Sequence, residues 1–391
     1  MNTYEDDRGY VHTTEETFGV DGQGSLYTTK NRGILLRLFD AEWDVKPILE
    51  ECKLLPLDRV DRLIRPSAFL STPPTTLNGC IFTVPEDFVS LRAMLDKDPN
   101  ENTREFYTRT GGLKRRLNIA MYIARILLQL HSLPVMYGSI APERILVSSD
   151  PKNAEAFLLY STGLSYSMNF AGRNDKDPYT APETAVGQSS TIASDVSAFA
   201  LMAYDLLTLR GEIPLENDAL QQLFDNAAQD TAVRPKLSAF YKAFSAWDDS
   251  LCICATCKAD ISPASSCGQC GAEATRFIKA VIYDRLEHGE LHRYTKFFPF
   301  GKEIQHFNTS HTGNLLFHEA PERAIDFVLN VSPDKKLRLI FKNIQKKTIT
   351  IDGKPIAENQ SFVVALPKDV IEMAVPMHPQ ATRRIDITIS Q

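Results

Sequence analysis

Residues 137–147 read YGSIAPERILV, and this stretch decides how the rest of the chain is interpreted. Four shorter segments accompany it in order: GVDGQGSLY at 19–27, YTAPE at 179–183, SDV at 194–196 and RP at 234–235. Short apolar runs and turn residues at 17–95 predict strands, with one helix at 42–57. Farther along, residues 113–133 are amphipathic with helical spacing, and 194–209 are almost wholly apolar. We expect an α+β fold that is β-rich first and helical afterwards.

In this order the five segments resemble the motifs of protein kinases. The 137–147 stretch matches the catalytic-loop frame H-G/R-D-x-K-P-x-N-I-L-V without a gap, and 179–183 matches the A-P-E segment. The stretch at 19–27 resembles the Gly-rich loop. The resemblance covers about residues 15–246. It implies a bilobal kinase-like fold, with an N-lobe at 1–95 and a helical C-lobe at 96–248.

The aligned catalytic positions lack the groups that phosphoryl transfer needs. A kinase uses a lysine on the phosphates, metal ligands and an aspartate that takes the hydroxyl proton. The corresponding residues here are Arg37, Ser139, Ala141, Arg144 and Ser161. Arg37 keeps a positive charge but not the compact ammonium of lysine, and Glu50 or Glu51 would be its helix partner. The resemblance therefore implies a pseudokinase.

The Gly-rich loop is altered as well. Asp21 stands at its middle glycine, among Gly19, Gly22 and Gly24. A carboxylate there would face the phosphates of a nucleotide, and carboxylates that would bind Mg²⁺ are missing. We therefore expect ATP to bind weakly or not at all.

Residues that hold a kinase fold together are retained. The resemblance pairs Glu183 with Arg234, and Asp195 would cap its helix or tether the catalytic-loop backbone. These residues favour a catalytically inactive scaffold that binds proteins in signalling. One alternative is an atypical kinase-fold enzyme that transfers phosphoryl or nucleotidyl groups. It would need replacement carboxylates in the cleft, for which the candidates are Asp21, Glu143, Asp175 and Asp177.

Five of the seven cysteines lie between residues 252 and 270. Cys254 and Cys257 form one C-x2-C knuckle, and Cys267 and Cys270 form a second, which is the layout of a zinc ribbon, here at 249–275. Four thiolates leave no open coordination position. We therefore predict one structural zinc ion per chain. Cys252 could replace Cys254, although the x2 spacing favours Cys254.

Residues 276–391 contain short apolar runs separated by turn residues, which predict a β-sandwich. The stretch KNIQKKTITIDGKPI at 342–356 resembles the last strands of a forkhead-associated domain. Gly301-Lys302 and Ser310-His311 faintly resemble the phosphate-reading loop of that family. A phosphopeptide reader is thus a further alternative, and a generic docking sandwich is another. The histidines at 288, 292, 306, 311 and 318 follow no metal-site spacing.

Composition narrows the function classes. The chain has 391 residues, with 24% charged residues and a net charge of -6, which does not favour a dedicated nucleic-acid binder. No apolar run approaches the length of a membrane span. The polar start MNTYEDDRGYVHTTEE lacks the features of a signal peptide, so we expect a cytoplasmic protein. Compact kinase-like domains with zinc ribbons resemble bacterial signalling proteins that act beside a phosphatase and a von Willebrand-type domain protein, which suggests such partners.

Overall fold

The computed structural model describes residues 2–21, 24–40, 54–71, 79–166, 179–254, 256–257, 259–261, 270, 272, 277–300, 302, 304–309, 311–313, 322–332, 334–378 and 381–389. The chain is mixed α+β and divides into two compact units, an N-terminal unit of residues 1–245 and a C-terminal unit of residues 246–391. Most of the helix predicted at 42–57 lies outside the described residues. Within those residues, no helix combines the length and apolarity that crossing a membrane would require.

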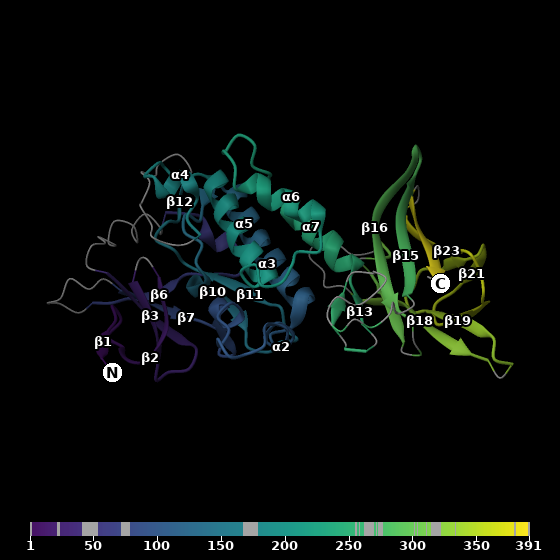
Figure 1. Cartoon of the computed structure of the whole chain (residues 1–391), viewed down its shortest axis with the longest axis horizontal. Coiled ribbons are helices and arrows are strands. Elements are labelled where there is room, and N and C mark those ends of the chain that lie inside the picture. Colours follow the sequence, from purple (N-terminus) through teal and green to yellow (C-terminus); the bar gives the residue numbers. More distant parts are fainter. Residues whose placement is uncertain are drawn as a thin grey trace. The chain divides into compact units, whose positions relative to one another are not determined.

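The N-terminal unit begins with a six-stranded antiparallel sheet in the order β1-β2-β3-β4-β7-β6 (Figure 1). Its strands are β1 (Thr3–Glu5), β2 (Val11–Asp21), β3 (Gly24–Thr29), β4 (Ile34–Phe39), β6 (Pro66–Phe69) and β7 (Gly79–Thr83). Leu36 on β4 lies opposite Ile81 on β7, and both are buried in a small core cluster. Because side chains alternate across a strand, Arg37 points to the other face.

The remainder of this unit is mainly helical. Its α-helices are α2 (Thr103–Arg109), α3 (Gly112–Ser132), α4 (Pro182–Ala185), α5 (Ile192–Thr208), α6 (Asp218–Ala227) and α7 (Leu237–Ser250), the last of which continues five residues past the boundary at residue 245. The side chain of Thr191 caps α5 by accepting from Ser194 N. Phe199 on α5 packs edge-on against Phe240 and Phe244 of α7, with ring centroids 5.9 and 6.2 Å away. The apolar helix expected from 194–209 is therefore central to the helical core.

Short strands and 3₁₀ turns position the residues of the 137–147 stretch. The turns are η1 (Leu57–Arg59), η2 (Leu91–Met94) and η3 (Pro142–Arg144). A four-stranded sheet has the order β5 (Leu63–Ile64), β11 (Ala156–Leu159), β10 (Ile145–Ser148) and β8 (Phe88–Ser90). The strands β9 (Val135–Met136) and β12 (Ser165–Tyr166) pair with each other. The stretch thus runs from β9 through η3 into β10.

The C-terminal unit contains two sheets around one core, which is a β-sandwich. The larger sheet has the order β16 (Gly289–Pro299), β15 (Phe277–Leu286), β24 (Ala381–Ile389), β23 (Ile371–His378), β20 (Ile349–Ile351) and β21 (Lys354–Ile356). The smaller has the order β17 (Gln305–Asn308), β18 (Arg323–Val331), β19 (Leu337–Asn343) and β22 (Ser361–Ala365). Phe298 from the first sheet meets Phe327 from the second at a centroid distance of 4.9 Å. A hairpin of β13 (Cys252–Ile253) and β14 (Asp260–Ile261) precedes them.

Candidate functional site

A buried ion network occupies the centre of the N-terminal unit. Asp21 ends β2, Arg37 lies on β4 and Arg144 ends η3, and their side chains are 1, 1 and 0% exposed. Arg37 Nη2 donates to both carboxylate oxygens of Asp21, at 2.6 and 2.9 Å. Arg144 Nε donates to Asp21 Oδ2 at 2.8 Å, and its Nη1 donates to the carbonyl and the hydroxyl of Ser139. Three of the positions named from the sequence therefore meet at one carboxylate.

The two guanidinium groups decide the charge state of Asp21. Burial alone would raise its pKa, but Arg144 and Arg37 outweigh burial and hold the pKa well below its usual range. The carboxylate therefore stays ionised, and the three side chains together carry a net positive charge. Burial also raises the pKa of neighbouring Tyr137 above its usual range. A divalent cation placed here would meet two arginines and a carboxylate that is already bound.

The Gly-rich segment packs closely on η3. A Cβ added to Gly19 would lie 2.9 Å from Glu143 Cγ, so only glycine fits without displacement. Gly24 has a φ of +143°, and a Cβ there would lie 2.1 Å from the carbonyl oxygen of Leu38. Gly22 lies outside the described residues. Gly19 thus makes room for the Glu143 side chain, and Gly24 for the backbone of β4.

Of the four carboxylates on which an atypical enzyme would depend, the two in the described residues, Asp21 and Glu143, form ion pairs with arginines. Glu143 is 2% exposed and forms an ion pair with Arg92 Nε. Asp21 is held by its two arginines, as described above. Asp175 and Asp177 lie outside the described residues. Ala141, which aligns with the lysine of the kinase catalytic-loop motif, is buried and supplies no side-chain cap to η3.

Asp195 fixes the backbone of the 137–147 stretch. Its Oδ2 accepts from Tyr137 N at 2.7 Å and lies 3.0 Å from His131 Nε2, while its Oδ1 accepts from Gly138 N at 2.8 Å. Of the two roles left open for this residue, the structure shows the tether, because Thr191 supplies the helix cap. A Cβ at Gly138 would lie 2.4 Å from Gly163 O. The loop is therefore held by one carboxylate and one close backbone approach.

Glu183 and Arg234 form a two-point ion pair. Arg234 Nη1 and Nη2 donate to the two carboxylate oxygens of Glu183 at 2.5 and 2.7 Å, and Ser194 Oγ donates to one of them at 2.7 Å. The hydrogen bonds from Arg234 lower the pKa of Glu183 to about 2 against the opposing effect of burial. Arg234 Nη1 also donates to Ala193 O at 3.1 Å. The pair thus connects α4 with the start of α5.

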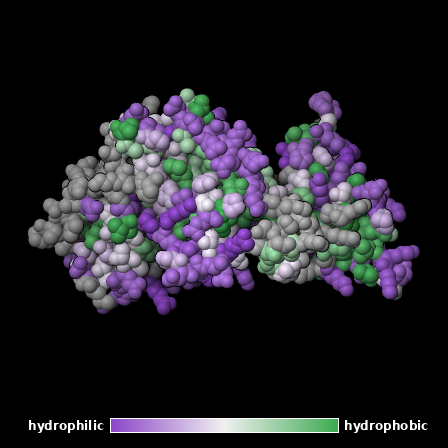
Figure 2. All heavy atoms as spheres, in the orientation of Figure 1, coloured by the Kyte–Doolittle hydropathy of each residue, from purple (hydrophilic) through white to green (hydrophobic). Residues whose placement is uncertain are grey.

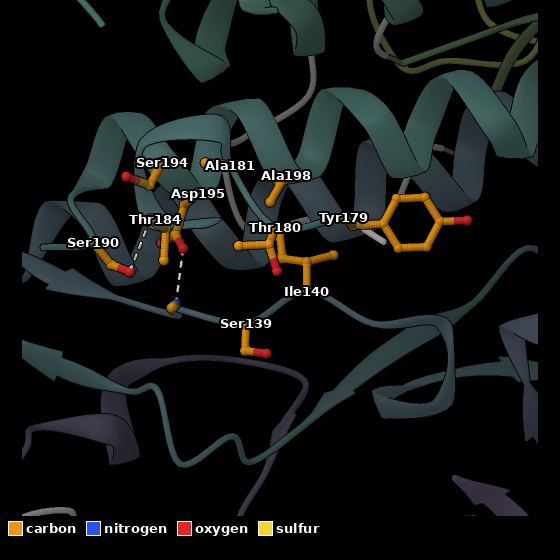
Figure 3. A pocket seen from close by; sticks show the side chains of 11 residues that line it. Ser139, Ile140, Tyr179, Thr180, Ala181, Thr184, Ser190, Ser194, Asp195 and Ala198 are labelled. Carbon is orange, nitrogen blue, oxygen red and sulfur yellow. Dashed lines mark hydrogen bonds between the residues drawn. The ribbon is translucent and has the colours of Figure 1, made fainter. Parts of the chain in front are cut away.

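A small cavity lies between the Ser139 segment and the start of α5 (Figure 3). Its volume is about 20 Å³, which is room for about one water molecule and not for a substrate. Ser139, Ser190 and Thr184 line it, and the hydroxyls of the last two lie 3.3 Å apart. Ser161 is buried, and its Oγ accepts a hydrogen bond from Gly163 N at 3.1 Å. The described hydrogen bonds of these hydroxyls are therefore local.

Three cysteines of the predicted ribbon lie together in the C-terminal unit. The Sγ atoms of Cys254, Cys257 and Cys270 all lie within 4.8 Å of one another, and those of Cys254 and Cys270 are 3.7 Å apart. Such a group of thiols could hold a metal ion. Cys267 lies outside the described residues. Cys252 is not part of the trio, and its thiol donates to Ile261 O at 3.2 Å.

The cysteine group has its own small core. Buried Cys252, Cys254 and Ala259 pack with Phe277, the first residue of β15, and Phe277 meets Phe297 edge-on with centroids 6.4 Å apart. The hairpin β13–β14 pairs Cys252 with Ile261. The ribbon region is therefore packed on the sandwich strands of the same unit.

The histidines of the C-terminal unit gather at no metal site among the residues that can be described. His311 is buried; its Nδ1 accepts from Asn308 N at 3.1 Å, and its carbonyl accepts from Arg383 at 3.2 Å. The His311 side chain therefore helps to shape its own loop. Gly301, Ser310 and His318 lie outside the described residues, whereas Lys302 is exposed.

The comparisons with known proteins give little. No family model matches the chain. A segment of 128 residues, 30% of the chain, is 31% identical to U-box domain-containing protein 32 of Arabidopsis thaliana. The chain spans 15% of the length of that protein. A likeness of this extent shows no family for the chain.

Sequence reasoning missed two contacts of the central network. One is the ion pair of Asp21 with Arg144, which are 123 residues apart, and the other is the pair of Glu143 with Arg92. The sequence did contain a signal for the contact between Asp21 and Arg144. In the alignment that the kinase resemblance implies, an acid replaces a glycine at position 21 and a base replaces an asparagine at position 144. Opposite charges introduced together suggest partners.

Proposed function

We propose that this chain is a catalytically inactive protein-kinase-like protein that binds other proteins in signalling. The observation that most supports this proposal is the bridge that Asp21 makes between Arg37 and Arg144. These residues align with the glycine loop, the phosphate-binding lysine and the metal-binding asparagine of a kinase. Here both arginines donate to the Asp21 carboxylate, at distances of 2.6 to 2.9 Å.

The arrangement of the N-terminal unit supports the kinase-like, bilobal part of this proposal. An antiparallel sheet precedes a helical region, in the order that the resemblance implies. The pair of Glu183 with Arg234 and the tether of Asp195 occupy the positions that hold a kinase fold together. The residues that match the kinase motifs are the structural ones, and the residues at the catalytic positions are replaced.

The proposal includes one structural zinc ion, held by Cys254, Cys257 and Cys270 with Cys267 as the fourth ligand. All four are thiolates, which suit zinc in a closed tetrahedral site. The thiol trio supports this assignment, because its atoms already lie close enough to share one ion. A cytoplasmic location, where thiols stay reduced, is part of the same proposal. A phosphatase or a von Willebrand-type domain protein is the partner that the bacterial resemblance suggests.

Incubation with radiolabelled ATP and Mg²⁺ or Mn²⁺, with generic protein substrates, tests the inactive cleft. We expect no transfer, and we expect millimolar Mg-ATP to leave the melting temperature unchanged, because a ligand that binds the folded chain would raise it. The variant Arg37→Ala is the control for contaminating kinases. Phosphorylation by the wild-type protein that Arg37→Ala abolishes would contradict the proposal.

A further inference from the structure

The smaller sheet of the sandwich has an open edge at β22. On one side β22 pairs with β19, and no described strand pairs with its other side. Leu366 N donates to Leu337 O across the β19 side at 2.9 Å. Backbone groups alternate direction along an antiparallel strand. The N–H and C=O groups of Ser361, Val363 and Ala365 therefore point away from β19.

This edge lacks the features by which proteins usually protect an edge strand. Charged side chains, prolines and bulges discourage unwanted pairing. The other edges of the sandwich have them: β21 contains Lys354 and Pro355, β16 contains charged residues such as Arg293, and the pairing of β17 shifts register. In contrast, β22 reads SFVVA with neither charge nor proline. Among the described edges, β22 is the one best suited to accept another strand.

An apolar row leads to this edge across the outer face of the sheet. Val328, Ile340 and Val363 lie directly opposite one another on β18, β19 and β22. Val363 is 48% exposed, and the other two are partly buried. Figure 2 shows hydrophobic residues at the surface over β18 and β19, between hydrophilic ones. An added strand with an apolar residue beside Val363 would extend the row.

Two basic residues flank the row. On β19, Arg338 lies opposite Ala365 and Lys342 lies opposite Ser361. Because Ala365 and Ser361 are small, the long basic side chains can cross them to a strand added about 4.8 Å farther out. Lys342 is exposed and lies opposite Asp326 of β18, which Arg323 already binds at 2.7 Å, and the Arg338 guanidinium lies 3.5 Å from Asp334. The edge therefore favours acidic residues on the incoming strand.

We propose that the β22 edge binds an extended segment of a partner protein that places an apolar residue between two acidic residues, each two positions away. Residues two apart share one face of a strand, so the apolar residue meets Val363 and the acids meet Arg338 and Lys342. A second copy of this chain fits less well, since it would bring the same basic residues to the edge. The inference rests on the proposed protein-binding function for its biological role, but it uses no residue of the cleft.

The test uses the full chain and a fluorescein-labelled peptide, Thr-Glu-Thr-Val-Thr-Glu-Thr, in fluorescence anisotropy. We expect saturable binding that Val363→Lys weakens by about tenfold or more, or at least 1.4 kcal/mol. The double variant Arg338→Glu with Lys342→Glu should instead prefer the peptide with lysines in place of the glutamates. Lys346→Glu removes an exposed lysine outside the row and should bind as the wild type does. Hydrogen exchange should slow at the N–H groups of Val363 and Ala365 when the peptide binds.

Several results would overturn the inference. These are no binding to the wild-type chain, binding that Val363→Lys leaves intact, or an unchanged peptide preference after charge reversal. Dimerisation of the free wild-type chain that Val363→Lys abolishes would make a second copy the occupant. The two proposals fail separately, because a chain that transfers phosphate and still binds this peptide contradicts only the inactive cleft.

Discussion

Asp21 offsets the charge of two buried arginines, Arg37 and Arg144. Asp21→Asn keeps the shape of the side chain but leaves Arg37 and Arg144 buried with no carboxylate to offset them. Breaking a buried ion pair from one side costs about 3–5 kcal/mol. We expect a loss of this size in the unfolding free energy, measured with urea. Asp58→Asn, at an exposed position on η1, is the matched control and should be nearly neutral.

Glu183 gives the N-terminal unit a defined sensitivity to acid. Its pKa falls from 4.5 to about 2 on folding. A carboxylate with a lowered pKa contributes stability in full above its unfolded pKa and loses it as the pH falls through the folded value. Glu183→Gln should therefore be less stable at neutral pH, with a weaker pH dependence between about 4.5 and 2. Urea midpoints over this range check it, and an unchanged slope would count against the ion pair; Glu86→Gln, exposed on a turn, is the control.

The sequence predicted these residues unequally. Glu183, Arg234 and Asp195 could be found because the kinase resemblance implies their structural roles. The sequence placed Asp21 against a nucleotide, whereas the structure places it against Arg144. Spacing along the chain carries no information on a contact across 123 residues, and only the opposite charges pointed to it.

The two C-x2-C knuckles allow a prediction about which cysteines bind the metal. Cys257→Ser should lose the metal, and Cys252→Ser should keep it, because the Cys252 thiol is already hydrogen-bonded to Ile261 O. Metal content of the purified variants by plasma emission measures this. Since structural metal binding is coupled to folding, hydrogen exchange at β13 and β14 should rise in Cys257→Ser. Metal loss in Cys252→Ser with retention in Cys254→Ser would reverse the assignment.

Periodicity located the main helices but not every boundary. The apolar stripe at 113–133 and the run at 194–209 correspond to α3 and α5 within a few residues. The next two helices are separated by a gap, since α6 ends at Ala227 and α7 begins at Leu237. Pro235 lies in the gap, and a proline disfavours helix in the residue before it. Arg234 lies in the same gap, outside both helices, and its side chain binds Glu183.

The whole molecule should unfold in two steps, because each compact unit has its own core. Calorimetry of the full chain should resolve two transitions. Asp21→Asn should lower only the transition of the N-terminal unit. A chelator should lower only that of the C-terminal unit, since the thiol trio belongs to residues 246–391. A single transition that both treatments shift would show that the units unfold as one.

The arginine at position 37 has a consequence for chemical proteomics. Nucleotide-derived reagents that survey kinase clefts by covalent labelling depend on a lysine amine that can be acylated. A guanidinium remains protonated at cellular pH, and Arg37 is 1% exposed and held by Asp21. We therefore expect such reagents to leave position 37 unlabelled even where the protein is abundant. If such a survey fails to detect this protein, the arginine at position 37 is a sufficient reason, and the result is no evidence that the protein is not expressed.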